Sequence, residues 1–280
     1  MTDRGDFSRQ SFLGPDSEQI LADVSVAIVG LGGGGSHIAQ QLAHLGVEHI
    51  RLIDPQEIDA GNLNRLVGAT HADVVAKTPK VRIAERLIKA VRPWAHVEGV
   101  QSEWQLASDY LKDAHVVFGC LDGYLQRMNL ERATRRFCVP YIDIGMDVTK
   151  LGDGTHAVAG QMIKTIPHGP CMSCIGFLTQ DRLNREENDY GDAGINPQVV
   201  WTNGTLASLA VGAFVQLLTP WFAYNREFEW LELDGNNQLV SRSRQPDYVM
   251  RGPCQHFSRD DVGDPFFDLK TFNSNAALAE

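Results

Sequence analysis

A glycine-rich turn between an expected strand and an expected helix constrains this chain more than any other feature. Residues 24–29 (VSVAIV) are a short apolar run that stops at glycine, as a buried parallel strand does. The turn GLGGGGS (30–36) follows, and apolar residues at helical spacing come next: Ile38, Leu42 and Leu45. Glycines let a nucleotide approach the backbone, and the helix start favours an anion.

Strands and helices alternate along the first half of the chain. Apolar runs at 49–53 and 115–121, and a third that begins at 140, are typical of buried strands. Amphipathic stretches at 80–91 and 124–137 predict helices between them. This order predicts an α/β fold with a Rossmann-like, doubly wound, mostly parallel sheet.

The second half of the chain has a different pattern. A strand at 160–166 and a strongly apolar helix at 203–218 precede two runs that flank a glycine–asparagine turn, 227–234 and 238–242. These runs predict an antiparallel C-terminal extension of the sheet. We expect a single domain over 1–255, followed by a polar tail at 257–280. Within the domain, the nucleotide-binding half is expected at 20–150, and the substrate and metal half at 151–256.

Composition limits the classes of partner. The N-terminus, MTDRGDFSRQ, lacks the apolar core of a signal peptide, and no apolar run reaches the roughly 18 residues of a membrane span. We therefore expect a cytoplasmic protein without membrane contact. The net charge of −10 argues against nucleic acid as the main partner, because phosphate backbones bind basic surfaces.

The second predicted strand ends at Asp54. A carboxylate at this place accepts hydrogen bonds from ribose hydroxyls. A glycine loop with this acidic partner favours a nicotinamide cofactor over ATP, and a glycine turn without any ligand is the simplest alternative. The residues that follow Asp54 reverse this order.

The segment after Asp54 ends in Asn62-Leu-Asn-Arg65 and resembles the NLNRQ segment of ThiF, MoeB, HesA and the ubiquitin-activating enzymes. Three shorter segments resemble the family in the same order: Arg9-Gln10, Lys77-Thr-Pro-Lys80 and Leu121-Asp122-Gly123. The resemblance runs from about residue 7 to residue 218. It implies an ATP-dependent adenylyltransferase rather than a dehydrogenase.

The resemblance implies a role for each matched residue. Gly30, Gly32, Gly33 and Gly35 would frame ATP, and Asp54 would bind its ribose. Asn62 and Arg65 would hold the triphosphate. Lys80 would contact phosphate oxygens near the reacting α-phosphorus, with Lys77 as the alternative.

The resemblance implies roles for two further residues, and two positions depart from the family pattern. Asp122 would coordinate Mg²⁺ or lie beside it. Arg9 would reach ATP, in its own chain or in the neighbouring subunit of a homodimer. Leu66 stands where the family has glutamine, and Gly123 where it has asparagine.

Cysteine positions narrow the expected chemistry. Family members that form a thioester need a nucleophilic cysteine in or after the crossover loop, and no cysteine lies between Cys174 and Cys254. Cys120 and Cys138 fall at a predicted strand and helix end, and are expected to be buried. The chain therefore resembles the members without a crossover-loop catalytic cysteine, and its reaction is expected to stop at the acyl-adenylate.

The remaining cysteines indicate a metal site. The family often uses two C-x-x-C pairs, and this chain offers Cys171 and Cys174, then Cys254 and His256. A tetrahedral zinc site with three sulfurs and one nitrogen is chemically reasonable. A degenerate site without metal and a redox-active pair are the alternatives. A disulfide framework is not expected, because the five cysteines are odd in number and the compartment is reducing.

The polar stretch 179–195 corresponds by position to the family's crossover loop, which covers the substrate's C-terminal tail. Its high charge predicts disorder until a partner binds. A simple mobile surface loop is the alternative.

The leading hypothesis is an enzyme that adenylates the C-terminal carboxylate of a small ubiquitin-like or sulfur-carrier protein, typically ending in Gly-Gly. A short peptide or a modified tRNA base is an alternative substrate, and the acidic composition disfavours tRNA. A catalytically weak partner subunit of an activating complex is the second hypothesis. An NAD(P)-dependent oxidoreductase ranks last, because no acid–base constellation for hydride transfer accompanies the glycine loop.

Overall fold

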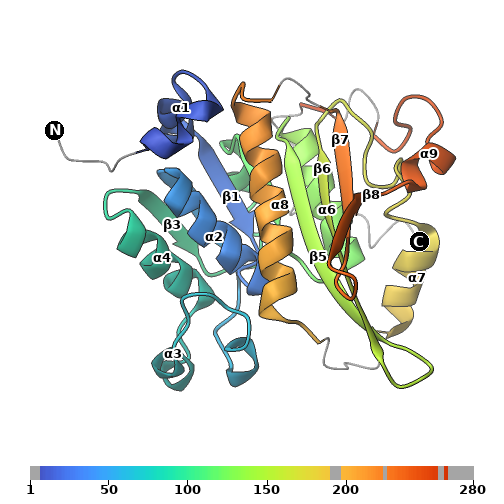
Figure 1. The fold of residues 1–280 in the computed structure, drawn as a ribbon, viewed down its shortest axis with the longest axis horizontal. Coiled ribbons are helices and arrows are strands. Elements are labelled where there is room, and N and C mark those ends of the chain that lie inside the picture. Colours follow the sequence, from blue (N-terminus) through green and yellow to red (C-terminus); the bar gives the residue numbers. More distant parts are fainter. Residues whose placement is uncertain (1–6, 190–196, 223–225, 258–261, 264–280) are drawn as a thin grey trace.

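One sheet runs through the whole protein. The computed structural model describes residues 7–189, 197–222, 226–257 and 262–263. Within these residues the sheet has eight strands in the order β3-β2-β1-β4-β5-β6-β7-β8 (Figure 1). They are β1 (Ser25–Val29), β2 (His49–Ile53), β3 (His96–Val100), β4 (Val116–Gly119), β5 (Tyr141–Lys150), β6 (His156–Thr165), β7 (Phe228–Asp234) and β8 (Leu239–Arg242). Pairing is parallel from β3 to β5 and antiparallel from β5 to β8, which confirms the predicted fold class.

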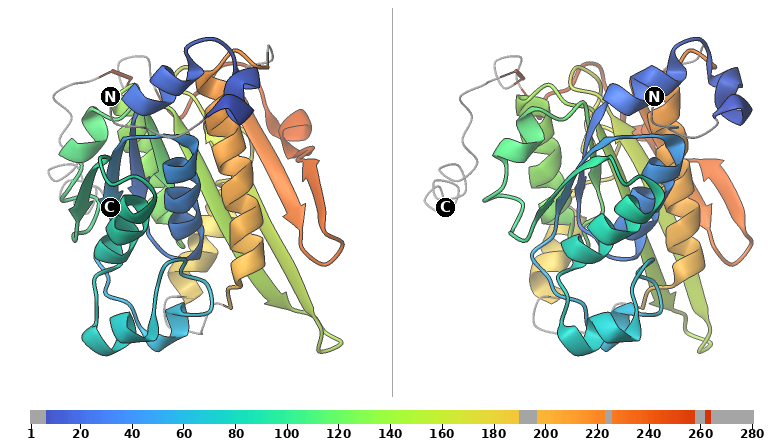
Figure 2. Two further views of the ribbon diagram at one scale, coloured as in Figure 1. Left: turned by 60° about the vertical axis from the view of Figure 1, so that its left-hand side comes forward. Right: turned by 90° about the vertical axis from the view of Figure 1, so that its left-hand side faces the viewer.

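Helices cover both faces of this sheet. They are α1 (Ser17–Asp23), α2 (Gly33–Leu45), α3 (His71–Ala76), α4 (Lys80–Val91), α5 (Asp109–Lys112), α6 (Tyr124–Arg136), α7 (Gln180–Asp189), α8 (Val200–Leu218) and α9 (Gln245–Val249), with 3-10 turns η1 (Ser8–Leu13) and η2 (Ala60–Asn62). In Figures 1 and 2, α2, α4 and α8 lie on one face, and α6 lies on the other. None of the helices in the described ranges has the length and apolarity of a membrane span.

The side-chain alternation of β1 divides the core into two layers. Val26 and Ile28 belong to the cluster shared with α2, α4 and α8, whereas Ala27 and Val29 belong to the cluster on the α6 side. Successive strand residues point to opposite faces, so a central strand buried on both sides must be apolar throughout. α8 comes from the second half of the chain and packs against α2, so both halves share one core.

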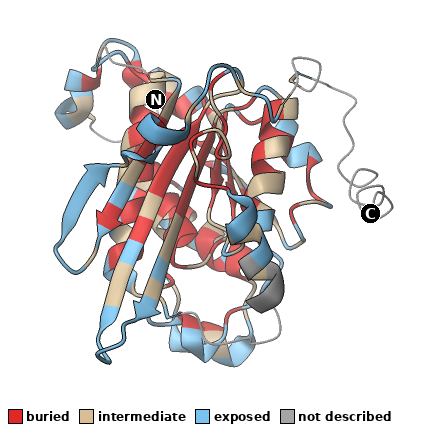
Figure 3. Ribbon diagram, turned by 90° about the vertical axis from the view of Figure 1, so that its right-hand side faces the viewer, coloured by how far each residue is buried: buried red, intermediate tan, exposed pale blue. Residues whose placement is uncertain are grey.

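The antiparallel strands extend the sheet into solvent. β5 and β6 pair over ten residues each, and their far ends are exposed (Figure 3). β8 is exposed along its whole length. Asn236, in the turn between β7 and β8, accepts a hydrogen bond from the Val158 N–H and donates to the His156 carbonyl. This side chain fixes the turn against β6.

The polar stretch predicted to be disordered is partly helical. Its first part is α7, and residues 190–195 lie outside the described part of the chain. Glu186 of α7 accepts a hydrogen bond from the Leu125 N–H at the start of α6. Arg182 donates to the Phe177 carbonyl and stacks on the Phe177 ring. These contacts order the helix, so composition alone was misleading here. β3 was missed because its exposed and half-buried residues carry no apolar run.

The segment 55–79, which carries the NLNR residues, is closed at its base and braced internally. A bridge pairs Glu57 with Pro79. The Asp73 carboxylate, at the start of α3, accepts two hydrogen bonds from the Arg86 guanidinium on α4 and two from Thr70. Hydrogen bonding to Arg86 lowers the pKa of Asp73 well below its ordinary value. This carboxylate therefore stabilises the fold in its ionised form.

We expect Asp73→Asn to lower the free energy of unfolding by about 2 kcal/mol near neutral pH, because charge-assisted hydrogen bonds are lost. Since the folded-state pKa is depressed, this contribution is present above the unfolded pKa near about 4 and fades as the pH falls further. Urea unfolding at about pH 7 and about pH 3 measures it. Asp113→Asn, which removes an exposed ion pair with Arg51, should cost less than about 0.5 kcal/mol. An equal effect of both substitutions, or no pH dependence, would contradict this assignment.

Candidate functional site

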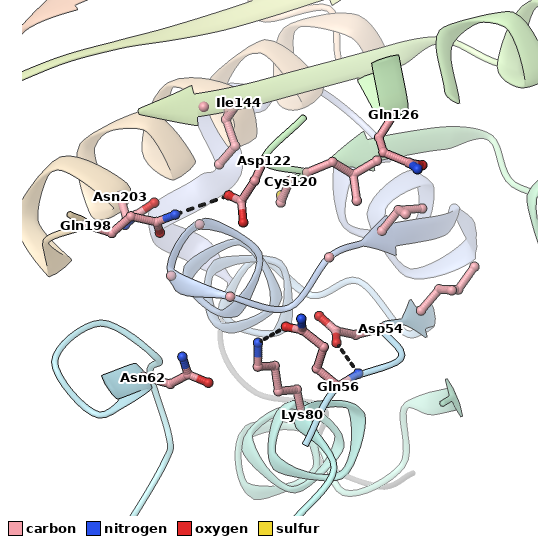
Figure 4. Close-up of a pocket in the computed structure, with 18 of the residues that line it drawn as sticks. Asp54, Gln56, Asn62, Lys80, Cys120, Asp122, Gln126, Ile144, Gln198 and Asn203 are labelled. Carbon is pink, nitrogen blue, oxygen red and sulfur yellow. Dashed lines mark hydrogen bonds between the residues drawn. The ribbon is translucent and has the colours of Figure 1, made fainter. Parts of the chain in front are cut away.

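A cavity of about 430 Å³ lies at the carboxyl ends of the parallel strands. β1 and β4 are neighbours there, and their chains turn to opposite faces of the sheet, into α2 and α6. Such a switch point is where doubly wound sheets bind ligands. Eight of the residues predicted to form the site line this cavity: Gly30, Gly32, Gly33, Asp54, Asn62, Arg65, Lys80 and Asp122. Figure 4 labels Asp54, Asn62, Lys80 and Asp122 among them.

The glycine turn brings the start of α2 against the end of β4. Gly30 has a φ of +89°, and a Cβ there would lie 2.4 Å from the carbonyl oxygen of Cys120. A Cβ on Gly35 would lie 1.9 Å from the carbonyl oxygen of Gly30. Gly35 thus allows the helix to pack on the turn, and it does not line the cavity. The helix begins at Gly33, inside the glycine turn, so its N-terminus opens on the cavity.

Asp54 joins the ends of β1 and β2. One carboxylate oxygen accepts from the Leu31 N–H at 2.7 Å, and the other accepts from the Gln56 N–H at 2.8 Å. The side chain is buried and also lines the cavity. A carboxylate oxygen has further acceptor capacity, so this geometry leaves room for a ribose hydroxyl.

The NLNR residues form one wall of the cavity. Asn62 ends η2, and its amide oxygen accepts from the Asp59 N–H. Arg65 donates to the carbonyl of Gly61 and to the amide oxygen of Asn64. Neither of these partners is a carboxylate, so in the described part of the chain no hydrogen-bonded acid compensates the charge of the guanidinium.

The structure explains why leucine stands at position 66, where the family has glutamine. Its side chain is buried with Ile58 and Ile83 in a small separate core. That core joins the segment 55–79 to α4. An apolar residue is therefore favoured at this position of the chain.

Lys80 begins α4 and points into the cavity. Only 6% of the residue is exposed, and its ammonium donates to the amide oxygen of Gln56 at 2.5 Å. The Lys80 N–H also donates to the Gln56 carbonyl. Lys77, the alternative, is exposed in a left-handed conformation after α3 and does not line the cavity. The structure therefore favours Lys80 over Lys77 as a cavity cation.

Asp122 lies across the cavity, between β4 and α6. Its carboxylate is exposed and accepts from the side-chain amide of Gln198 at 3.1 Å. It does not cap α6, whose N-cap residue is Gly123. A Cβ on Gly123 would lie 2.3 Å from a carboxylate oxygen of Glu186, so a side chain at this position would displace that carboxylate.

Arg9 lies outside the cavity. It is exposed on η1, whose residues Phe12 and Leu13 pack near Leu45 at the far end of α2. A 13-residue helix is about 20 Å long, so Arg9 does not reach the cavity of its own chain. The expectation that it reaches ATP in a neighbouring subunit remains a prediction.

Sequence reasoning missed several cavity residues. Gln198 bridges two walls, because its side chain reaches Asp122 and its carbonyl accepts from Asn64. Asn203, at the start of α8, is buried against the glycine turn. Arg127 reaches the cavity from α6. These residues come from segments distant in sequence and carry no local motif, so the order of motifs contained no signal for them.

The two cysteines expected to be buried differ from that expectation. Cys120 is half-buried and lines the cavity, and burial raises the pKa of its thiol, as do the carboxylates of Asp143 and Asp122. This thiol therefore stays protonated and is a weak nucleophile. Cys138 is exposed at a φ of +57°, because the chain reverses between α6 and β5.

Arg127 is anchored to a buried carboxylate behind the cavity. It donates to Asp143 on β5 at 2.5 Å, and the Tyr141 hydroxyl donates to the other oxygen of Asp143 at 2.8 Å. Burial raises the pKa of Asp143 to about 6, although Arg127 and Tyr141 oppose the shift. Near neutral pH the pair is therefore ionised, with the carboxylate desolvated.

A second cluster lies apart from the cavity and matches the predicted metal ligands. The donor atoms of Cys171, Cys174, Cys254 and His256 all lie within 4.8 Å of one another. The Cys171 and Cys174 sulfurs are 3.6 Å apart, and His256 Nδ1 is 3.5 Å from Cys171 Sγ and 3.3 Å from Cys174 Sγ. Tetrahedral zinc, with bonds of about 2.3 Å to sulfur and about 2.0 Å to nitrogen, places two sulfurs about 3.8 Å apart and a sulfur and a nitrogen about 3.5 Å apart. The donor set and spacing fit zinc.

α6 holds the first cysteine pair in place. The buried Glu131 carboxylate accepts from the Met172 N–H with both oxygens. Arg135 donates to the carbonyls of Pro167, Gly169 and Pro170. The loop before the cysteines is therefore set by side chains of one helix.

Comparisons with known proteins agree with this site. The chain is 30% identical over 210 residues to the sulfur carrier protein ThiS adenylyltransferase of Escherichia coli, a match that covers 72% of this chain and 78% of that protein. It is 26% identical over 165 residues to the SAMP-activating enzyme E1 of Haloferax volcanii, over 58% of this chain and 57% of that enzyme. The match thus spans little more than half the length of the second relative.

The fold has a solved counterpart. The crystal structure of E. coli MccB with MccA-N7isoASN superposes with a TM-score of 0.71 and 18% identity, over 91% of this chain and 74% of that one. At this identity the likeness concerns the fold. The model of the ThiF family matches residues 7–259. The chain therefore belongs to the ThiF family, as its sequence predicted.

Proposed function

We propose that this chain uses ATP to adenylate the C-terminal carboxylate of a small ubiquitin-like or sulfur-carrier protein, or of a peptide, and releases pyrophosphate. The two relatives above, by name an adenylyltransferase of a sulfur carrier and an activating enzyme, support this class of reaction. The resemblance in the NLNR segment supports ATP as the nucleotide.

The buried ammonium of Lys80 is the observation that carries the proposal. Among the described residues its hydrogen-bond partner is the neutral amide of Gln56, and it pairs with no carboxylate. A buried charge is costly unless an opposite charge compensates it. Lys80 lies at the N-terminus of α4 and lines the same cavity as Arg65 and the start of α2. All of these features favour a polyanion.

The proposed reaction needs charge stabilisation rather than covalent participation of the protein. A carboxylate oxygen attacks the α-phosphorus and forms the acyl–phosphate bond, while the bond from the α-phosphorus to the departing pyrophosphate oxygen breaks. Both the electrophile and the leaving group are highly anionic. Lys80 and Arg65 are placed to neutralise that charge, and Asp54 to hold the ribose.

The carboxylate of Asp122 is suited to coordinate magnesium. Its carboxylate is exposed to the cavity, and its hydrogen-bond donor, the side-chain amide of Gln198, is neutral and displaceable. Magnesium prefers oxygen ligands and keeps several waters, so one carboxylate and phosphate oxygens suffice to bind it. When bound, the cation would supply further neutralisation of phosphate charge.

We further propose that the reaction stops at the acyl-adenylate. The chain has no cysteine between Cys174 and Cys254, and the thiol of Cys120 is kept protonated by burial. A thioester would therefore need an outside cysteine. The homodimer, the role of Arg9 within it, the cytoplasmic location and the domain boundaries remain predictions, and most of the predicted tail lies outside the described residues.

Zinc at the cysteine–histidine cluster would serve the structure. The cluster ties the loop before α7 to the segment after α9, which are distant in sequence. Four ligands close the coordination shell, as in structural zinc sites. Zinc would therefore support the part of the chain that leads into α7.

The proposed reaction predicts ATP–pyrophosphate exchange that depends on a carrier protein ending in Gly-Gly. We expect exchange with at least one member of a panel of such carriers, and no turnover of NADH or NADPH. Radiolabelled pyrophosphate entering ATP is the measurement. Nucleotide binding without exchange for any carrier or peptide would instead support the catalytically weak partner subunit.

Lys80→Ala should lower the exchange rate by about 10²–10³ and leave the fold intact, because one preorganised charge contact is lost. The matched control is Lys77→Asn, which removes the neighbouring lysine and keeps a residue that tolerates its left-handed backbone. Exchange in the control should stay within about twofold of the unaltered protein. Full exchange in Lys80→Ala would remove Lys80 from the site.

Protein purified without chelator should contain about one zinc per chain by elemental analysis, since four donors are preassembled. Cys254→Ser should lose most of this zinc and melt at a lower temperature. Cys138→Ser is the control, because Cys138 is exposed and belongs to no cluster in the described residues. Substoichiometric zinc in the unaltered protein would argue against a zinc site.

A further inference from the structure

The exposed side of α2 and α8 carries no formal charge. Neither helix contains an aspartate, glutamate, lysine or arginine, although α2 spans 13 residues and α8 spans 19. Figure 1 looks onto these helices, which lie in front of the sheet. In α4, on the same face of the sheet, five of the 12 residues are charged. A helix face in water ordinarily carries charged side chains, so the uncharged pair indicates a face that another molecule covers.

The hydroxyl groups at the centre of this face are already satisfied within the chain. The Ser208 hydroxyl donates to the Gly204 carbonyl and accepts from the side-chain amide of Gln41. The Thr205 hydroxyl donates to the Trp201 carbonyl. Covering these hydroxyls leaves neither donor unpaired, because each already donates to its own helix. The centre of α8 can therefore be buried at low cost.

The two ends of the face have opposite shapes. At the start of α8, Trp201 is 64% exposed. At the other end, a groove of about 520 Å³ lies between α2, η1 and the last turns of α8, with Leu13, Leu45 and Trp221 in its walls. Phe12 of η1 is 67% exposed and packs edge-on against Trp221 at this groove. One end thus offers a projecting indole, and the other offers an apolar recess.

Ser208 lies midway between the indole and the recess. Trp201 comes seven residues before it, and Val215, which lines the groove, comes seven residues after it. At about 1.5 Å per residue, each end is about 10 Å from Ser208 along the helix. At about 100° per residue, the three side chains lie within about 40° of one another around α8. A two-fold axis beside Ser208, at right angles to α8, therefore superimposes the indole of one copy on the recess of another.

We infer that this face binds a second copy of the chain, with the two α8 helices antiparallel and Trp201 of each copy in the groove of the other. A second copy supplies both halves of the fit, whereas an unrelated partner would have to supply a projection and a recess at the same spacing. Two helices about 28 Å long and about 10 Å wide each cover roughly 1,100 Å² in total over both copies. This area exceeds the roughly 1,000 Å² that a specific interface needs.

This dimer brings the partner subunit close to the cavity. Gln198 and Asn203 line the cavity near the start of α8, beside Trp201. Since η1 forms one wall of the groove, η1 of the partner subunit lies against Trp201 there. Arg9 is on η1, so this geometry gives it the position that its predicted role in a neighbouring subunit requires. Dimer formation itself does not depend on the proposed reaction.

Sedimentation velocity of the whole chain at micromolar concentration is the first measurement. The unaltered 30.9 kDa chain should sediment as a dimer. Trp201→Glu should sediment as a monomer with an unchanged circular dichroism spectrum, because it places a charge in the apolar groove of the other copy. Leu106→Glu, at an exposed leucine outside α2 and α8, should remain a dimer. A monomeric unaltered chain, or a dimeric Trp201→Glu variant, overturns the inference.

A disulfide across the two-fold axis tests the register of the two helices. Ser208→Cys, made together with Cys138→Ser to remove an exposed native thiol, should form a covalent dimer under mild oxidation. Helices packed about 8–10 Å apart bring the two Cα atoms at the axis within about 6 Å, which a disulfide can span. Thr205→Cys in the same background should not cross-link, because its two copies lie about 9 Å apart along the helices. Equal cross-linking of both variants, or none in Ser208→Cys, overturns this register.

The same variants separate a second copy from a carrier protein as the occupant of this face. A monomeric chain whose affinity for a Gly-Gly carrier falls in Trp201→Glu would assign the face to the carrier and overturn the dimer. Pyrophosphate exchange is measured separately from mass. A dimer without exchange would refute adenylation and keep the interface, whereas exchange by a monomeric chain would do the reverse.

Discussion

The carboxylate of Asp54 organises the nucleotide end of the cavity. By accepting from Leu31 and Gln56, it fixes the glycine turn against the segment that leaves β2. Gln56 in turn accepts two hydrogen bonds from Lys80. Its amide oxygen accepts from the ammonium, and its carbonyl accepts from the backbone N–H. One buried acceptor thus sets the positions of an anion-binding turn and of a buried cation. The acid expected to bind ribose is therefore also the structural link between the two phosphate-binding elements.

The residues at this end of the cavity could be predicted from the sequence, because they lie in short motifs that follow buried strands. Asp54, Asn62, Arg65 and Lys80 all belong to one stretch of chain, and the boundaries of β2 and α4 agree with prediction. Gln198, Asn203 and Arg127 reach the cavity from the second half or from helix interiors. Their role follows from the packing of α6 and α8 on the sheet, which no local pattern encodes.

The order of α7 was not predicted for the same reason: it depends on a contact between segments distant in sequence. The charged residues of α7 favour disorder, yet the Glu186 carboxylate accepts a hydrogen bond from the Leu125 N–H at the start of α6. That contact also accounts for Gly123, since the carboxylate occupies the space beside it. The same contact thus explains why Gly123 departs from the family motif and why α7 is ordered rather than disordered. The composition of a segment indicates how readily water solvates it. It does not show which partners the segment meets in the fold, such as an N–H group at the start of another helix.

α6 joins the two sites of the molecule. Arg127, Glu131 and Arg135 are spaced four residues apart and share one buried stripe of α6, where a helix packed on a sheet ordinarily carries apolar side chains. Arg127 contacts the cavity, while Glu131 and Arg135 hold the loop before Cys171. Buried charges add little net stability after desolvation, but removing one partner is costly. The stripe therefore acts by specifying geometry: it fixes Arg127 at the cavity and the loop before the metal cluster to the same helix.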